Sequence, residues 1–138
     1  SKRTQYRLAK SREDYIKCHK FLKSLNRDCK LSYPTIIAVR DDEIIGSVST
    51  ETRKGGVVAY ALIVNPDIKG GITWLRLADT YESVLFRSGV QEYKFDILKN
   101  TGSWIKACQR ALNVKPYAED GDRYYYKKNI ERRSGWEV

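Results

Sequence analysis

The chain has 138 residues, of which 41% are hydrophobic, and its 26 lysine and arginine residues exceed its 17 aspartate and glutamate residues to give a net charge of +9. This length and composition predict a single globular domain, 1–138, with a core that needs no disulfide or metal. Three widely spaced cysteines and one histidine argue against a structural zinc site, so we expect no metal and a reducing compartment. We expect a cytoplasmic protein without a membrane contact, because no apolar run reaches membrane-spanning length. The excess of positive charge favours an anionic partner and leaves nucleic acid open as one.

The N-terminal quarter predicts a strand followed by a helix. Residues 5–9 are the strand, and Ser11 with an acidic residue three positions later is typical of a helix N-terminus. The following helix has an apolar face and a basic face, the basic one being Lys17, Lys20, Lys23 and Arg27. This basic stripe is either a solvated surface or a contact for an anionic partner.

Three strands separated by short polar turns come next. Residues 35–39 and 44–50 are apolar and rich in β-branched side chains, and residues 57–64 form a longer apolar run. The turns between them, 40–43 and 53–56, are short enough for hairpins. The pattern predicts an antiparallel meander.

A glycine turn links the third strand of the meander to an amphipathic helix, residues 72–88. The turn reads Asp67-Ile-Lys-Gly-Gly-Ile-Thr-Trp74. Glycines let backbone N–H groups approach a ligand closely, and a helix N-terminus carries partial positive charge. The turn is therefore an anion site or an ordinary strand-to-helix connection.

The remainder predicts a strand at 93–98, a helix at 104–112 and a strand at 123–127, with residues 131–138 expected to fray. A strand-helix-strand crossover favours parallel neighbours, which places the glycine turn at the carboxyl end of a central strand. The order β-α-β-β-β-α-β-α-β predicts an α+β fold with a mixed, mostly antiparallel sheet and helices on both faces.

Over residues 5–130 this order, with three motifs, resembles the GNAT superfamily of N-acetyltransferases. Asp41-Asp-Glu-Ile-Ile-Gly46 is similar to the charged turn and I-x-G strand of the family, and Val64-Asn-Pro66 is similar to the V-x-P end of its fourth strand. Lys69-Gly-Gly-Ile-Thr73 resembles the loop that holds the pyrophosphate of coenzyme A, although it is one residue shorter and lacks the last small residue.

The resemblance implies an acyl-CoA-dependent N-acyltransferase, using acetyl-CoA or another acyl-CoA, in which an acceptor amine of a small molecule or macromolecule attacks the thioester directly. It implies that Lys69, Gly70, Gly71, Ile72 and Thr73 hold the phosphates, and that Leu62, Val64 and Asn100 lie along the pantetheine arm. Glu51 is the matching carboxylate for a base. The helix tyrosine that often protonates the thiolate in the family is missing from residues 107–113, and Tyr117 and Tyr126 are the candidate substitutes.

The alternative is a non-catalytic acetyltransferase-like binding or structural protein with a basic surface for an anionic partner. A second, short resemblance supports it: Asn100-Thr-Gly-Ser-Trp-Ile-Lys106 and Asp120-Gly-Asp122 resemble segments of small proteins of short-tailed bacteriophages. That resemblance adds the virion to the cytoplasm as an expected location.

Overall fold

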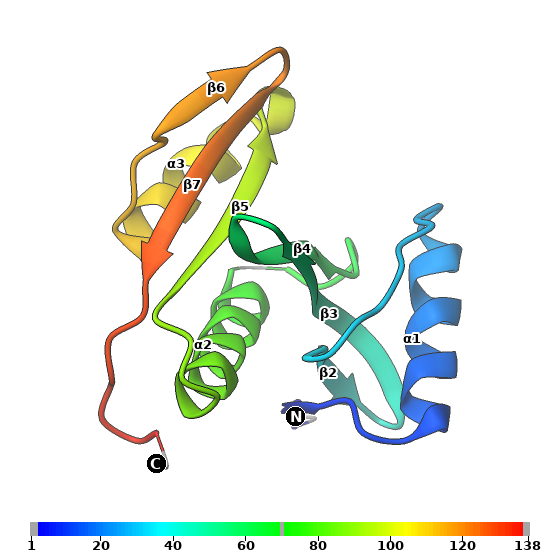
Figure 1. Cartoon of the computed structure of the whole chain (residues 1–138). Helices are drawn as coiled ribbons and strands as arrows, with labels where there is room; N and C mark the ends of the chain where they lie inside the picture. The colour runs from blue at the N-terminus through cyan, green and yellow to red at the C-terminus, as the bar shows by residue number, and fades with distance from the viewer. Residues whose placement is uncertain (1–2, 70, 137–138) are drawn as a thin grey trace.

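The computed structural model describes residues 3–69 and 71–136. Within this range the chain folds as one seven-stranded sheet with three α-helices and a short 3₁₀ turn (Figure 1). The elements are β1 (Gln5–Leu8), α1 (Arg12–Ser24), β2 (Ile36–Arg40), β3 (Glu43–Arg53), β4 (Gly56–Val64), α2 (Ile72–Arg87), β5 (Glu92–Leu98), η1 (Lys99–Thr101), α3 (Ser103–Leu112), β6 (Ala118–Asp120) and β7 (Arg123–Asn129).

The sheet has the strand order β1-β2-β3-β4-β5-β7-β6, and its neighbours are antiparallel except for β4 and β5. The predicted meander and the parallel crossover through α2 are both confirmed. Strand β6 was not predicted from the sequence. Its three residues are all exposed at the edge of the sheet, so they carry no alternation of apolar and polar side chains.

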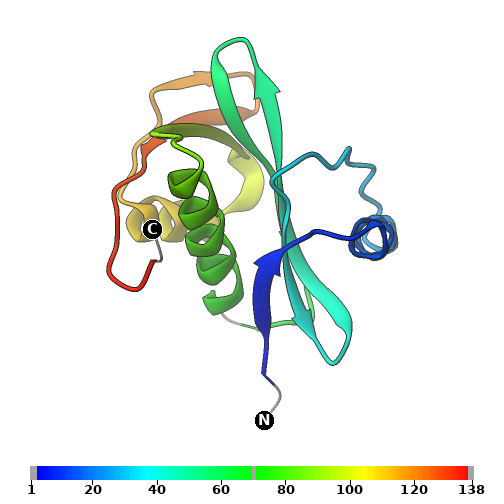
Figure 2. The same ribbon diagram turned by 60° about the horizontal axis from the view of Figure 1, so that its bottom comes forward.

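Helices cover both faces of the sheet, as predicted. Figure 2 shows α1 on one side and α2 with α3 on the other. The alternation in β2 fits this arrangement, because Ile36 and Ala38 pack in the core beneath α2 while Ile37 packs beneath α1. Ser11 and Asp14 form the capping box expected at the start of α1.

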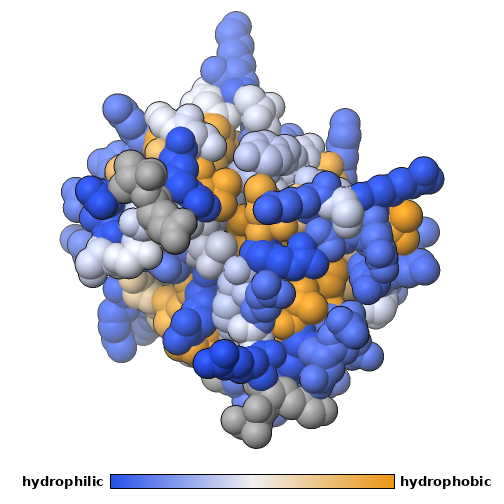
Figure 3. Space-filling view, turned by 90° about the horizontal axis from the view of Figure 1, so that it is seen from below, coloured by the Kyte–Doolittle hydropathy of each residue, from blue (hydrophilic) through white to orange (hydrophobic). Residues whose placement is uncertain are grey.

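The sequence predicts that residues 131–138 fray; the described part, 131–136, contacts α2, and residues 137 and 138 lie outside the described residues. Arg133 forms an ion pair with Asp79, and the Trp136 ring lies 5.6 Å from the Phe86 ring. On the face seen in Figure 3, hydrophilic side chains (blue) surround areas of hydrophobic ones (orange). Among the described residues, no helix is both long and apolar enough to cross a membrane.

Candidate functional site

Strands β4 and β5 are paired over only a short stretch and then diverge. Their parallel ladder consists of two residue pairs, Val57 with Tyr93 and Val58 with Lys94. Both strands continue well past these pairs, β4 to Val64 and β5 to Leu98. The carboxyl half of β4 therefore has no strand partner on its β5 side.

A β-bulge lies in the carboxyl half of β4, where the strand pairs with β3 but not with β5. Across the β3–β4 ladder, Ser47 pairs with Ile63 and Ser49 pairs with Tyr60, so β4 uses one residue more than β3 over the same distance. A bulge interrupts the ladder and redirects backbone groups and side chains. The bulge therefore frees further backbone groups of β4 to bind a ligand.

A cavity of about 510 Å³ lies beside the carboxyl half of β4, which no longer pairs with β5, and we call it the β4 groove. The end of β4 and the turn after it form one wall, while the first turn of α2 and the start of α3 form the other. The lining residues are Arg27, Leu62, Ile63, Val64, Asn65, Pro66, Ile68, Gly71, Trp74, Ser103, Trp104 and Ala107. The Trp74 and Trp104 rings lie 5.6 Å apart within this lining.

The N-terminus of α2 closes one end of the groove. Gly71 is its N-cap and supplies no side-chain hydrogen bond to the first N–H groups of the helix. A Cβ at Gly71 would lie 3.0 Å from Trp74 Nε1, so the glycine keeps this corner open. Thr73 Oγ1, in the same turn, is buried and has no hydrogen-bond partner among the described residues.

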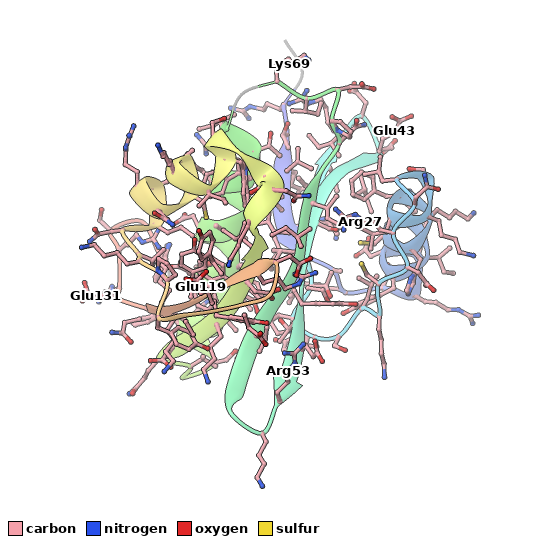
Figure 4. The ribbon with its side chains drawn as sticks, turned by 90° about the horizontal axis from the view of Figure 1, so that it is seen from above. Arg27, Glu43, Arg53, Lys69, Glu119 and Glu131 are labelled. Atoms are coloured by element: carbon pink, nitrogen blue, oxygen red, sulfur yellow. The ribbon has the colours of Figure 1, made fainter. Side chains whose placement is uncertain are left out.

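The structure places the predicted cofactor residues in different surroundings. Leu62, Val64 and Gly71 line the β4 groove, whereas Lys69 is exposed on the turn above it (Figure 4). Ile72 and Asn100 are exposed and do not line the groove, Asn100 being part of η1. Gly70 lies outside the described residues.

Nine of the twelve residues that line the groove were not predicted as site residues, among them Trp74, Trp104 and Arg27. Trp74 and Trp104 have helical spacing typical of core residues, so nothing local distinguished them from ordinary packing. Arg27 follows α1, which lies on the opposite face of the sheet from α2 and α3. Only the tertiary fold brings this residue to the groove (Figure 4).

Glu51, the candidate base, is not among the residues that line the β4 groove. It pairs with Val58 across the β3–β4 ladder and so lies beside the point where β4 leaves β5. Figure 4 shows its neighbour Arg53 at the opposite end of the β3–β4 hairpin from Lys69. Arg53 donates a hydrogen bond of 2.8 Å to Glu51, which lowers the pKa of this half-exposed carboxylate.

The two candidate tyrosines differ in environment. Tyr117 is half exposed in the loop before β6, with Lys127 Nζ 4.3 Å from the centre of its ring. Tyr126 is fully buried beneath α3, where its hydroxyl accepts a hydrogen bond of 2.8 Å from Gln109 Nε2. Burial raises the pKa of the nearby Cys108 thiol to about 11, so this cysteine is protonated at neutral pH.

The fold is similar to solved structures of N-acetyltransferases. The chain matches the ribosomal-protein-S18-alanine N-acetyltransferase from Escherichia coli with a TM-score of 0.71 and 11% identity, over 96% of this chain and 97% of that one. It matches a protein from Desulfovibrio desulfuricans that is assigned as an acetyltransferase of the GNAT family with a TM-score of 0.71 and 10% identity, over 94% and 100%. It matches PaiA N-acetyltransferase from Thermoplasma acidophilum, solved in complex with coenzyme A, with a TM-score of 0.63 and 15% identity, over 86% and 71%.

At the level of sequence, no family model and no curated protein matches the chain. The structural likeness at these identities concerns the fold. The chain has the GNAT fold, which confirms the fold class predicted from the order of its elements.

Proposed function

We propose that this chain, with its GNAT fold, is an acyl-CoA-dependent N-acyltransferase that takes acetyl-CoA or another acyl-CoA. One observation carries the proposal: β4 and β5 separate after two residue pairs, and the groove beside the carboxyl half of β4 ends at the N-terminus of α2. Solved structures of this fold include one in complex with coenzyme A, which supports the same reading.

The residues present fit such a cofactor. Backbone groups of β4 around the bulge and at Val64 have no strand partner on the β5 side and would hydrogen-bond the pantetheine amides. Lys69 and the first N–H groups of α2 would hold phosphate oxygens, and the unpartnered Thr73 hydroxyl adds a further polar group in that turn. Bound acyl-CoA supplies an acyl carbon activated as a thioester.

The acceptor amine would approach from the paired end of β4, where Glu51 lies. The amine nitrogen bonds to the acyl carbon as the carbon–sulfur bond breaks, so the amine loses one proton and the sulfur gains one. Glu51 is the proposed base, acting directly or through a water molecule. Tyr117 and Tyr126 are the two proposed acids. Tyr117 is half exposed, and Tyr126, although fully buried, accepts from Gln109 and keeps its own O–H free to donate.

Binding of acetyl-CoA is the first test. A ligand selective for the native state raises the melting temperature, and isothermal titration measures its affinity. Trp104→Ala removes part of the groove wall and should weaken binding at least about tenfold. Trp136→Ala is the matched control, since it removes another half-buried tryptophan that packs on Phe86 outside the groove. Equal affinities for the two variants would contradict the proposed binding site.

The tyrosines can be tested separately by measuring thiol release. Tyr126→Phe keeps the ring that stacks on Phe95 at 4.9 Å and removes only the hydroxyl, so turnover should fall by about 10² or more if Tyr126 supplies the proton. Tyr117→Phe should then have little effect. If only Tyr117→Phe lowers turnover, Tyr117 supplies the proton. If neither variant lowers turnover, solvent supplies it.

A second candidate function is a non-catalytic one, and a specific surface favours it. A cavity of about 520 Å³ at the C-terminal end of α3 is lined by Lys115, Lys127, Lys128, Arg132 and Arg133, with one acidic residue, Glu131. Lys115, Lys127 and Arg132 have no ion-pair partner among the described residues. If acetyl-CoA leaves the melting temperature unchanged while a polyanion such as single-stranded DNA raises it in a salt-dependent manner, this candidate replaces the first.

A further inference from the structure

The face of β5 and β7 that points away from α2 and α3 holds a second, smaller cavity. Helix α1 lies on this side of the sheet but packs over Ile37, Val39 and Ile63, at the other end of the strand order. No helix of the described chain covers this face of β5 and β7 (Figures 1 and 2). The cavity there measures about 230 Å³, and its lining includes Arg53, Val58, Lys94, Asp96, Tyr117 and Tyr125. We call it the β5 cavity.

The β5 cavity abuts the point at which the two parallel strands stop pairing. Val58 and Lys94 form the last residue pair of the β4–β5 ladder, and both line the cavity. Glu51, the cross-strand partner of Val58, is beside it. A molecule in the β5 cavity would therefore lie beside the paired end of β4, the strand whose carboxyl half lines the β4 groove.

The charges in the cavity leave one cation without a counter-ion. Asp96 forms an ion pair with Arg123, and Arg53 forms one with Glu51. Lys94 is half buried and has no ion-pair partner among the described residues. The Lys94 ammonium lies 3.2 Å from the position that a Cβ would take at Gly55, so it reaches back over the β3–β4 hairpin.

An anion that enters the cavity would gain a charge-assisted hydrogen bond from the Lys94 ammonium, which has no carboxylate partner among the described residues. Tyr117 and Tyr125 supply apolar ring surface around it. The volume corresponds to roughly eight water molecules at about 30 Å³ each, which suits a molecule of amino-acid size rather than a polymer segment.

We propose that the β5 cavity is the acceptor site and that it selects a small amine with a carboxylate next to the amino group, as in an α-amino acid. The Lys94 ammonium binds the carboxylate, which leaves the amino group toward Glu51 and the paired end of β4. The inference rests on the proposed acyl transfer for its role as an acceptor site. Polyamines, which carry only positive charge, are excluded by the same cation.

The experiment compares L-α-amino acids with the matching amino acid amides, which keep the amine and lack the carboxylate. Thiol release from acetyl-CoA is measured for each, and kcat/KM is expressed per unprotonated amine because the two series differ in amine pKa. We expect the acids to exceed the amides at least about tenfold. Lys94→Ala should remove that preference by lowering kcat/KM for the acids about tenfold, while the amides and the affinity for acetyl-CoA stay unchanged.

Lys54→Ala is the matched control. Lys54 is an exposed lysine in the turn of the β3–β4 hairpin, and it does not line the cavity. Lys94→Arg keeps the positive charge and should retain most of the preference. A wild type that binds acetyl-CoA but uses acids and amides equally, or a Lys94→Ala variant with an undiminished preference, overturns the inference.

A second readout separates this inference from the proposed function. Amide chemical shifts of Val58, Lys94 and Tyr125 should change on titration with the amino acids and not with their amides, with or without acetyl-CoA. If acetyl-CoA fails to bind while these shifts still occur, the cavity is a carboxylate-binding site and only the transfer is wrong. If the amino acids cause no shifts, the cavity assignment is wrong whatever acetyl-CoA does.

Discussion

Asp14 joins the first turn of α1 to the strand before it. Its carboxylate accepts two hydrogen bonds from Arg7, at 2.7 and 2.8 Å, and two from the backbone N–H groups of Lys10 and Ser11. The side chain is 12% exposed. The hydrogen bonds from Arg7, with those from the backbone, hold the pKa of Asp14 well below its usual range.

We expect Asp14→Asn to lower the free energy of unfolding by about 2 kcal/mol at neutral pH. Because the folded-state pKa is depressed, the contribution of Asp14 is complete above its unfolded pKa of about 3.9 and is lost as the pH falls below that value. Urea unfolding at several pH values should show the wild type and the variant converging below about pH 4. Glu13→Gln, which alters an exposed neighbour, should cost less than about 0.5 kcal/mol at any of these pH values.

Some residues of the β4 groove could be predicted from the sequence, and others could not. Leu62, Val64 and Gly71 were predicted because they belong to one continuous motif, and the structure places them along the β4 groove. Arg27 and Trp104 come from distant parts of the chain, and only the folded sheet brings them to that groove. The roles of Glu51, Tyr117 and Tyr126 stay predictions.

Among the elements, β3 and α2 approach each other closely at a glycine. A Cβ added to Gly46 would lie 2.9 Å from Leu77 Cδ1 and 3.2 Å from the Ile63 carbonyl oxygen. Leu77 is fully buried in the core beneath α2, and the Ile63 carbonyl belongs to the backbone of β4, so neither atom can move aside easily.

Gly46→Ala should therefore cost about 1–3 kcal/mol of stability, measured by urea unfolding. Gly55→Ala provides the comparison, because its new Cβ would meet only the flexible end of Lys94. We expect that variant to lose less than about 0.5 kcal/mol. Similar losses at both glycines would show that helix α2 has room to shift.

Most helices and strands were predictable, because their apolar and polar residues alternate with a clear period. The alternation in Tyr93-Lys-Phe-Asp-Ile97 marks β5, and the apolar stripe of residues 72–88 marks α2. Strand β6 and the bulge in β4 could not be predicted in this way. Residues 118–120 are all exposed, and the bulge exists only relative to the register of β3.

Across the whole molecule, one buried carboxylate connects several distant elements. Glu82 of α2 is fully buried and accepts hydrogen bonds from the Tyr93 hydroxyl of β5 at 2.6 Å, from Lys128 of β7 at 2.7 Å and from Arg133 after β7. Burial, with the charge of Glu82 beside it, raises the pKa of Tyr93 well above its ordinary value. The carboxylate thus links α2 to the second half of the sheet.

Glu82→Leu should lower the free energy of unfolding by about 3–5 kcal/mol, because it leaves the largely buried Lys128 ammonium and the Tyr93 hydroxyl without their acceptor. Thermal or urea unfolding measures the loss. Asp79→Asn, at a half-exposed partner of the same Arg133, should cost less than about 1 kcal/mol. A loss for Glu82→Leu no larger than that of the control would mean that water replaces the carboxylate.

The two-residue pairing of β4 and β5 also has a consequence for local opening. It divides the sheet into two hydrogen-bonded blocks, β1 to β4 and β5 to β7, which are joined by these two pairs, by the packing of α2 and α3, and by Glu82. Amide hydrogens of β5 and β7 should therefore exchange with solvent as one cooperative group, independently of those in β2 and β3. A ligand in the β4 groove would contact β4 and helix α3, and α3 packs on Ile97 of β5 and Tyr126 of β7. Such a ligand would couple the two blocks, so hydrogen exchange would slow on the two sides together.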